Sequence, residues 1–351
     1  MKLPLKPPFP PMEAKLVGSI PAGDEYQYEP KWDGFRCLVF RDGDEIYLQS
    51  KAGQPLARYF PEVVENLRGL KAKRFVLDGE LVVPVEGQLS FDQLLQRIHP
   101  AASRIKKLSA EFPAIYIVFD LLADERGRAL HQEHLSVRRE KLEAFGRKYF
   151  RRDENIRLSP ATTEIAQARK WFKSTVASLD GIVAKHLDCS YRSGLRDGME
   201  KIKNIRSADC VVAGYRYGSK ATTTLGSLLL GLYDTDGLLH HVGFCSAFTA
   251  EQRKELTPKL EKLRRAVNKG GGFSGRAPGG PSRWSTERST EWVAVAPKLV
   301  VEVTYDHFTQ GRFRHGTNFL RFRPDKAAKQ CTMEQVTSTL PRLDALMSHA
   351  A

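Results

Sequence analysis

Alternating and continuous apolar runs predict strands in the first part of the chain. The runs Cys37–Phe40 and Glu45–Leu48 flank the turn-forming sequence Arg41-Asp42-Gly43-Asp44, and this arrangement predicts a β-hairpin. The runs Ile115–Phe119 and Gly181–Ala184 are almost wholly apolar, as in strands that are buried on both faces.

Apolar residues three or four positions apart predict helices in the same region. They are Phe91, Leu94, Leu95 and Ile98 in one segment, Leu142, Phe145 and Tyr149 in a second, and Ile165, Ala168 and Phe172 in a third. Ser90 and Gln93 give the first of these segments a capping-box sequence. The first part of the chain therefore alternates strand-like and helix-like segments.

Near Ile205 the pattern changes to short β-like runs separated by turns. The runs are Val211–Tyr217, Leu228–Tyr233, Leu238–Phe244, Trp292–Val295 and Leu299–Tyr305. Between the third and fourth run, Leu256, Leu260, Leu263 and Val267 share one helical face, and we place Pro258 at the helix start with Thr257 as its cap. Five strands with an inserted helix predict a small β-barrel of the oligonucleotide-binding (OB) type.

The change of pattern also predicts the domain boundaries. We expect a first domain over residues 1–205, the barrel domain over 206–332, and a helical tail over 333–351. The glycine-rich segment from Lys269 to Pro281 is predicted to be an exposed loop.

The composition favours a polyanionic binding partner. The 351 residues include 55 Lys and Arg against 41 Asp and Glu, a net charge of +14, and such an excess suits a nucleic acid. The five cysteines are scattered without a Cys-x-x-Cys pair, so neither a zinc ribbon nor a disulfide framework is indicated. The proline-rich N-terminus has no signal-peptide core, and no apolar run is long enough to span a membrane. We therefore expect a soluble cytoplasmic protein with no membrane partner.

Lys31 is the strongest candidate for chemistry, in the run Glu29-Pro30-Lys31-Trp32-Asp33-Gly34-Phe35-Arg36. A lysine amine has an ordinary pKa of about 10.4, so a lysine nucleophile needs a desolvated, cation-rich or metal-containing pocket that favours its neutral form. The neighbouring Gly34 lets backbone approach a ligand, and Arg36 can bind phosphate or ribose. By itself the run is also compatible with a surface turn at Asp33 and Gly34.

This run resembles the nucleotidyl-lysine motif Lys-x-Asp-Gly-x-Arg of ATP-dependent DNA ligases and mRNA capping enzymes. Further motifs of that superfamily follow in the expected order: Ser50-Lys51-Ala52-Gly53, Leu77-Asp78-Gly79-Glu80-Leu81-Val82, Phe119-Asp120-Leu121-Leu122, Asp180-Gly181-Ile182-Val183-Ala184-Lys185, Lys201-Ile202-Lys203 and Arg321-Phe322-Arg323-Pro324-Asp325-Lys326. The resemblance implies an α+β fold, with a nucleotidyltransferase (adenylation) domain of antiparallel sheets and flanking helices followed by an OB-fold barrel.

The resemblance also implies a three-step reaction. Lys31 attacks the α-phosphate of ATP and releases pyrophosphate, AMP moves to a 5′-phosphate of DNA, and a 3′-hydroxyl displaces it. Lys201 and Lys203 are assigned to catalysis with Lys31, since two residues two apart on an extended segment point to the same side. The residues assigned to nucleotide binding are Glu29, Lys31, Arg36, Lys51, Glu80, Phe119, Lys185, Lys201, Lys203, Arg323 and Lys326.

Magnesium or manganese is the implied metal, with Glu80 and Asp180 as its protein ligands. Glu29 is expected to select the base, and Phe119 to stack on adenine, although core packing is the alternative for Phe119. Asp78-Gly79 is either a hairpin turn or part of one continuous strand that carries Glu80.

Three positions depart from the family pattern. Asp180 stands where Glu is usual, which shortens the reach to a metal. Lys51 stands where Arg is common, so a bidentate phosphate contact becomes a point-charge contact. Met199 occupies a position often held by Trp. Lys31 itself is unaffected.

The C-terminal motif leaves two roles open. In the family it swings over the active site to orient pyrophosphate and then rotates away. Its charge, together with that of Arg312, Arg314 and His315, also suits a static contact with the DNA backbone.

The best overall interpretation is a compact ATP-dependent DNA ligase, similar to the ligase module of bacterial end-joining ligases. It would act as a monomer in DNA repair on nicked or broken duplex DNA, in the bacterial cytoplasm or nucleoid, with end-joining or repair proteins as possible partners. The alternatives are a GTP-dependent mRNA guanylyltransferase, an RNA ligase, and a non-catalytic DNA-end-binding module.

Overall fold

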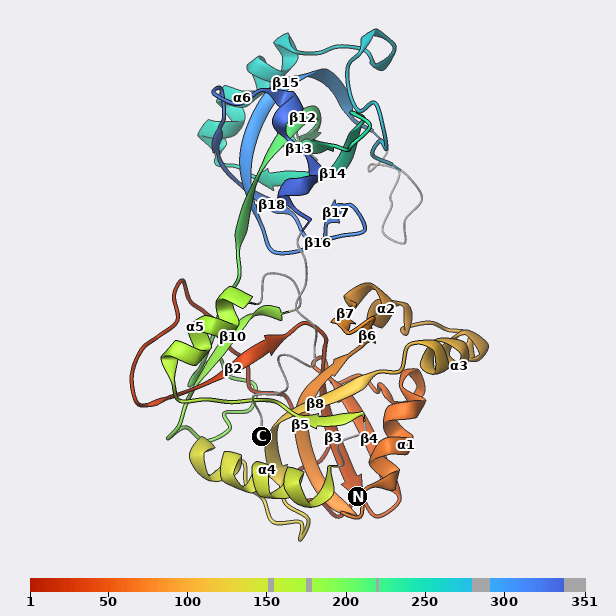
Figure 1. The fold of residues 1–351 in the computed structure, drawn as a ribbon, viewed down its shortest axis with the longest axis vertical. Helices are drawn as coiled ribbons and strands as arrows, with labels where there is room; N and C mark the ends of the chain where they lie inside the picture. The colour runs from red at the N-terminus through yellow and green to blue at the C-terminus, as the bar shows by residue number, and fades with distance from the viewer. Residues whose placement is uncertain (151–154, 175–178, 219–220, 280–290, 338–351) are drawn as a thin grey trace. The chain divides into compact units, whose positions relative to one another are not determined.

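The computed structural model describes residues 1–150, 155–174, 179–218, 221–279 and 291–337. The chain divides into two compact units, one built on Met1–Asn204 and the other on Ile205–Thr339 (Figure 1). Within the predicted helical tail, Met333–Gln335 form a 3₁₀ turn, and residues 338–351 lie outside the described residues. No helix among the described residues is long and apolar enough to cross a membrane.

The larger sheet of the first unit has the strand order β4-β3-β5-β8-β9. Its strands are β3 (Phe35–Asp42), β4 (Glu45–Ser50), β5 (Arg74–Val82), β8 (Ile115–Ala123) and β9 (Ile156–Leu158). Strands β3 and β4 pair antiparallel with Asp42 opposite Glu45, which confirms the predicted hairpin. Strand β5 runs without interruption through Asp78 and Gly79, so the strand interpretation is right and the turn is wrong.

The second sheet has the order β1-β11-β10-β2 and carries the lysine motif. Its strands are β1 (Lys15–Leu16), β2 (Tyr26–Trp32), β10 (Leu179–His186) and β11 (Met199–Lys203). The prediction of antiparallel sheets holds only in part, because β1 pairs parallel with β11 and β8 pairs parallel with β9. A parallel neighbour requires a long connection, and the connection from β8 to β9 contains a helix.

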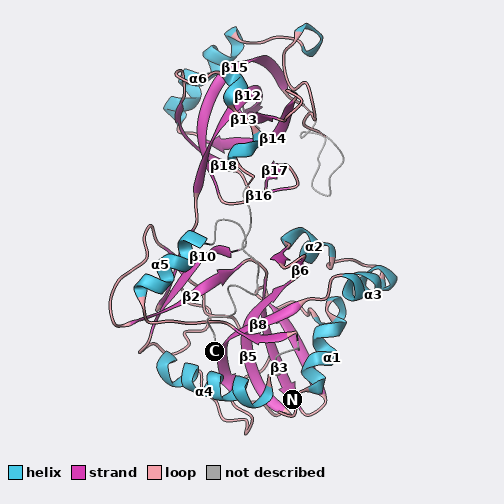
Figure 2. Cartoon of the chain, viewed as in Figure 1, coloured by secondary structure: helices cyan, strands magenta, loops and turns pink. Residues whose placement is uncertain are grey.

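Helices cover these sheets, as the secondary-structure colouring in Figure 2 shows. They are α1 (Pro61–Gly69), α2 (Phe91–Gln96), α3 (Ala102–Glu111), α4 (Leu135–Tyr149) and α5 (Ile165–Ser174), with a 3₁₀ turn at Ala57–Tyr59 and a short hairpin of β6 (Pro84–Val85) and β7 (Gln88–Leu89). Helix α4 packs against β8, and α5 packs against β2 and β10. The Ser90 hydroxyl accepts a hydrogen bond from the Gln93 amide at 3.3 Å, so the predicted N-cap forms.

The second unit contains a closed barrel of five strands in the order β12-β13-β14-β18-β15. They are β12 (Arg206–Gly218), β13 (Ala221–Tyr233), β14 (Leu239–Ala247), β15 (Val293–Tyr305) and β18 (Thr317–Phe322). Outside the barrel lie a hairpin of β16 (Phe308–Thr309) and β17 (Arg312–Phe313), and 3₁₀ turns at Val267–Lys269 and Ala328–Gln330. The runs predicted as two strands around Pro297 are the single strand β15, which has a register shift against β12. The fifth strand is therefore β18, which the apolar pattern missed because most of its side chains are not buried.

Two further predictions for the barrel unit are corrected. Helix α6 spans Ala250–Lys262 and begins at Thr249, whose side chain forms a full capping box with Gln252, so Pro258 lies inside the helix. The glycine-rich segment is not wholly exposed, because Phe273 packs in the barrel core and the Gly272 amide donates to the Val295 carbonyl at 2.9 Å. Its end at residues 280–281 lies outside the described residues.

Candidate active site

A pocket of about 180 Å³ in the first unit gathers residues from distant parts of the chain. The predicted site residues that line it are Glu29, Lys31, Arg36, Lys51, Glu80, Phe119, Lys185 and Lys201. One wall is the segment Pro11–Ala14, which contains none of the sequence motifs. Motifs that are far apart along the chain thus line one cavity.

Lys31 and Lys203 converge on Asp180. Lys31 on β2 lies opposite Gly181 on β10, and Gly181 in turn lies opposite Lys203 on β11. The Lys31 amine donates to Asp180 Oδ2, and Lys203 Nζ lies 3.8 Å from the same oxygen. This close three-strand contact needs glycine, because a Cβ at Gly181 would lie 1.8 Å from the Ile202 carbonyl oxygen.

The phosphate-binding candidates form a dense group of cations. The pKa of Lys201 is lowered from its ordinary value, first by burial and then by the positive charges of Lys31, Lys51, Lys203 and Arg196. Cations held this close repel one another, so an anionic ligand such as a triphosphate would relieve the repulsion.

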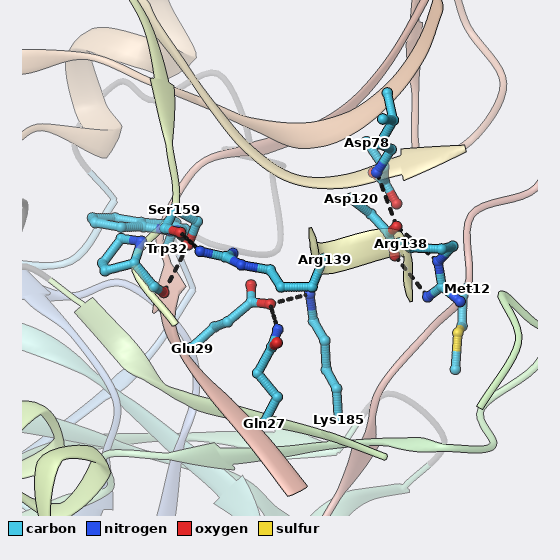
Figure 3. A network of polar contacts seen from close by, with 12 residues as sticks. Met12, Gln27, Glu29, Trp32, Asp78, Asp120, Arg138, Arg139, Ser159 and Lys185 are labelled. Carbon is cyan, nitrogen blue, oxygen red and sulfur yellow. Dashed lines mark hydrogen bonds and ion pairs between the residues drawn. The ribbon is translucent and has the colours of Figure 1, made fainter. Parts of the chain in front are cut away.

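The buried carboxylate of Glu29 lies beside Lys185 in the pocket lining (Figure 3). Glu29 accepts from Lys185 Nζ at 2.7 Å and from Gln27 Nε2 at 2.8 Å, and only 2% of it is exposed. The Phe119 ring lies 4.8 Å from Lys185 Nζ and 4.6 Å from the guanidinium carbon of Arg36. Phe119 is thus part of the pocket wall rather than of the core alone.

Arg36 is already engaged by a residue outside the predicted set. Its Nε and Nη2 each donate to a different oxygen of Asp78 at 2.6 Å, and Asp78 is fully buried on β5. Arg36 lines the pocket while this bidentate pair fixes its guanidinium. A carboxylate within an apolar strand needs a buried partner, and this is the sequence signal that could have identified Asp78.

Glu80 and Asp180 are the carboxylates predicted to bind metal. Burial, partly offset by Arg36 and Lys31, raises the pKa of Glu80 to about 8. Among the described residues no group of three or more His, Cys, Asp or Glu side chains could hold a metal by itself. Two carboxylates beside a phosphate site nevertheless fit Mg²⁺, which usually takes one or two from protein and completes its shell with phosphate and water.

Lys51 lies at the pocket rim, where its Nζ is 2.9 Å from Glu13 Oε2. Its side chain is 58% exposed, so it can exchange this carboxylate for a phosphate at little cost.

The barrel unit holds its own cluster around Asp209. Arg323 Nη1 lies 2.9 and 3.0 Å from the two Asp209 oxygens, and Lys326 Nζ lies 2.6 Å from one of them. Arg323 also donates to Asp325, at 2.8 Å from Nη2. The cations of the C-terminal motif are therefore held together by carboxylates of the same unit.

Comparison with known proteins identifies the family of the chain. Residues 11–203 match the family model described as ATP dependent DNA ligase domain, and residues 221–326 match the ATP dependent DNA ligase C terminal region. The chain is 44% identical to DNA ligase C1 of Mycolicibacterium smegmatis, over 97% of each chain. It is 31% identical to the multifunctional non-homologous end joining protein LigD of Pseudomonas aeruginosa, over 97% of this chain and 38% of that one.

A solved structure from a study of Lig E DNA ligases has the same fold. It covers 90% of this chain and 99% of that chain with a TM-score of 0.54, at 17% identity. The two family models and the 44% identical relative confirm the predicted ligase over the guanylyltransferase and RNA ligase alternatives. The chain belongs to the family of ATP-dependent DNA ligases.

Proposed function

We propose that this ligase seals breaks between 3′-hydroxyl and 5′-phosphate ends of duplex DNA, with Lys31 as the residue that carries AMP. The observation that carries the proposal is the position of Lys31 in the pocket, where its amine donates to Asp180 among several cations. In the first step the Lys31 nitrogen forms a bond to the α-phosphorus and the bond to pyrophosphate breaks. Asp180 holds the amine in place and is suited to receive its proton.

The other pocket residues have roles that follow from their chemistry. Lys201 and Lys203 would stabilise the charge that develops on the phosphates. Glu29, fixed by Lys185, would accept from the base amine, and Phe119 would stack on the base. Arg36 would bind the ribose, and Lys51 the 5′-phosphate of DNA.

Mg²⁺ or Mn²⁺ would be held by Glu80 and Asp180 together with phosphate oxygens. A bound divalent cation supplies charge neutralisation on the phosphates. Burial raises the pKa of Glu80, and a cation bound beside it would lower that pKa by favouring the ionised carboxylate.

We assign residues 1–205 to the adenylation domain and 206–332 to an OB-fold domain. The five-stranded closed barrel with one helix between its third and fourth strands along the chain supports the OB assignment. Arg323 and Lys326, presented together on Asp209, are suited to bind the pyrophosphate leaving group.

The biological context that we propose is repair of broken DNA in the bacterial cytoplasm or nucleoid. The likeness to an end-joining protein supports this context, and end-joining proteins are the corresponding candidate partners. The net charge of +14 suits a DNA substrate.

The test is sealing of a labelled nicked duplex with ATP and magnesium, beside the equivalent RNA substrate and a GTP control. Sealing of DNA with ATP is expected. Sealing of RNA alone, or a requirement for GTP, would contradict the proposal.

A further inference from the structure

A closed ring of hydrogen bonds ties the N-terminal wall of the pocket to Arg36. The Met12 amide donates to the Tyr191 hydroxyl at 3.0 Å, and this hydroxyl donates to Asp78 Oδ2 at 2.6 Å. Asp78 binds Arg36 through both oxygens at 2.6 Å, and Arg36 Nη2 donates back to the Met12 carbonyl at 3.3 Å. Met12 and Asp78 are both labelled in Figure 3.

The Asp78 and Tyr191 side chains of this ring are buried and closely packed. Asp78 is fully buried, and only 5% of Tyr191 is exposed. The Tyr191 ring stacks on Phe9 at 6.1 Å, and the Arg138 guanidinium lies 5.8 Å from its centre. Burial and the charge of Asp78 raise the pKa of the Tyr191 hydroxyl far above its ordinary value, so the group stays protonated and remains a donor.

The wall that this ring holds has little regular structure of its own. Residues 11–14 lie in neither helix nor strand, and their backbone is held by the loop that begins at Tyr191. The Glu13 amide donates to the Leu195 carbonyl at 2.8 Å, and the Gly194 amide donates to the Pro11 carbonyl at 3.3 Å. The position of the wall therefore depends on residues that follow β10 by only a few positions.

We propose that Tyr191 is a positioning residue for the nucleoside triphosphate. Tyr191 does not line the nucleotide pocket, but Met12 and Arg36 do. The Tyr191 hydroxyl fixes the wall at Met12 and also fixes the Asp78 carboxylate, which orients Arg36. Tyr191 therefore sets the width of the pocket and the direction of the Arg36 guanidinium. The inference rests on the proposed function, because it assigns the ligand of the same pocket.

The substitution that isolates this role is Tyr191→Phe, which removes the hydroxyl and keeps the ring. Tyr28→Phe is the matched control, since Tyr28 is also buried and its hydroxyl donates to a backbone carbonyl, that of Pro21, at 2.9 Å. Loss of one hydrogen bond to a buried carboxylate should raise the KM for ATP in lysyl-AMP formation about tenfold or more. The kcat of that step should change much less, because Lys31 and its partners are untouched.

A second measurement separates positioning from a general loss of stability. Hydrogen exchange of the amides of residues 12–14 should accelerate in Tyr191→Phe, while amides of β3 and β5 keep the protection of the unmodified protein. In Tyr28→Phe both the KM for ATP and the exchange at residues 12–14 should stay within about twofold of the unmodified protein.

The outcomes distinguish the two proposals. A Tyr191→Phe protein with an unchanged KM for ATP, or with exchange accelerated equally throughout the first unit, would overturn the positioning role. If the unmodified protein itself formed no lysyl-AMP, the proposed function would fail before Tyr191 was tested.

Discussion

The Lys31 amine donates a hydrogen bond to Asp180, a residue 149 positions later in the chain. The contact exists because β2 and β10 are neighbours in one sheet, and it places a carboxylate directly on the candidate nucleophile. Lys203 Nζ lies 3.8 Å from the same carboxylate oxygen. Asp180 therefore organises two of the three lysines that the sequence assigned to catalysis.

Asp180→Asn should slow lysyl-AMP formation by about a hundredfold or more, because the amide can neither accept a proton from Lys31 nor hold a cation as a carboxylate does. Asp180→Glu is the matched variant, since it keeps the carboxylate that the family usually has at this position. Single-turnover labelling with ATP measures both. Equal rates for the Asn variant and the unmodified protein would remove Asp180 from the chemistry.

The raised pKa of Glu80 gives a pH-dependent stability. Between the ordinary pKa of 4.5 and the folded value of about 8, the folded protein retains a proton that the unfolded chain has lost. The free energy of unfolding of the metal-free protein should therefore fall as pH rises through this window. Above the folded pKa the stability that the bound proton contributes is fully lost. Urea denaturation across this range measures the slope.

Glu80→Gln should flatten that slope, and magnesium should reduce it in the unmodified protein by favouring the ionised carboxylate. If the Gln variant kept the same slope, Glu80 would not be the group that titrates. If magnesium had no effect on the slope, the metal assignment of Glu80 would be wrong.

Binding to nicked duplex DNA should depend strongly on salt. With roughly 6 to 10 phosphate contacts, the affinity should fall on the order of a thousandfold between about 50 and 200 mM salt. Fluorescence anisotropy with a labelled nicked duplex measures the dependence. A flat response would show that the charge of +14 does not serve DNA binding.

The sequence predicts correctly those features that are formed by residues close together in the chain. The hairpin at Arg41-Asp42-Gly43-Asp44 and the N-cap at Ser90 form as predicted, because turn chemistry and capping involve only a few consecutive residues. Helix α6 begins at Thr249 and not at the predicted Pro258, because the capping box of Thr249 and Gln252 sets its start and Pro258 is accommodated inside the helix.

Features that depend on distant residues were harder to predict. Strand β18 is short and mostly unburied, so only its pairing with β14 and β15 identifies it. In the pocket, motif order located Lys31 and its cationic partners, whereas Tyr191 and the wall at Met12 carry no motif. Their roles arise from hydrogen bonds that join Met12 to Tyr191, 179 positions apart, and Tyr191 to Asp78, 113 positions apart.

The most direct measurement is mass spectrometry of the protein after incubation with ATP and magnesium, followed by peptide mapping, beside a Lys31→Ala variant. We expect the mass of one adenylyl group on Lys31 and no adduct in the variant, which should still fold because 22% of the Lys31 side chain is exposed at the pocket. An unmodified Lys31 in the wild-type protein, or a full-strength adduct in Lys31→Ala, would contradict the catalytic assignment.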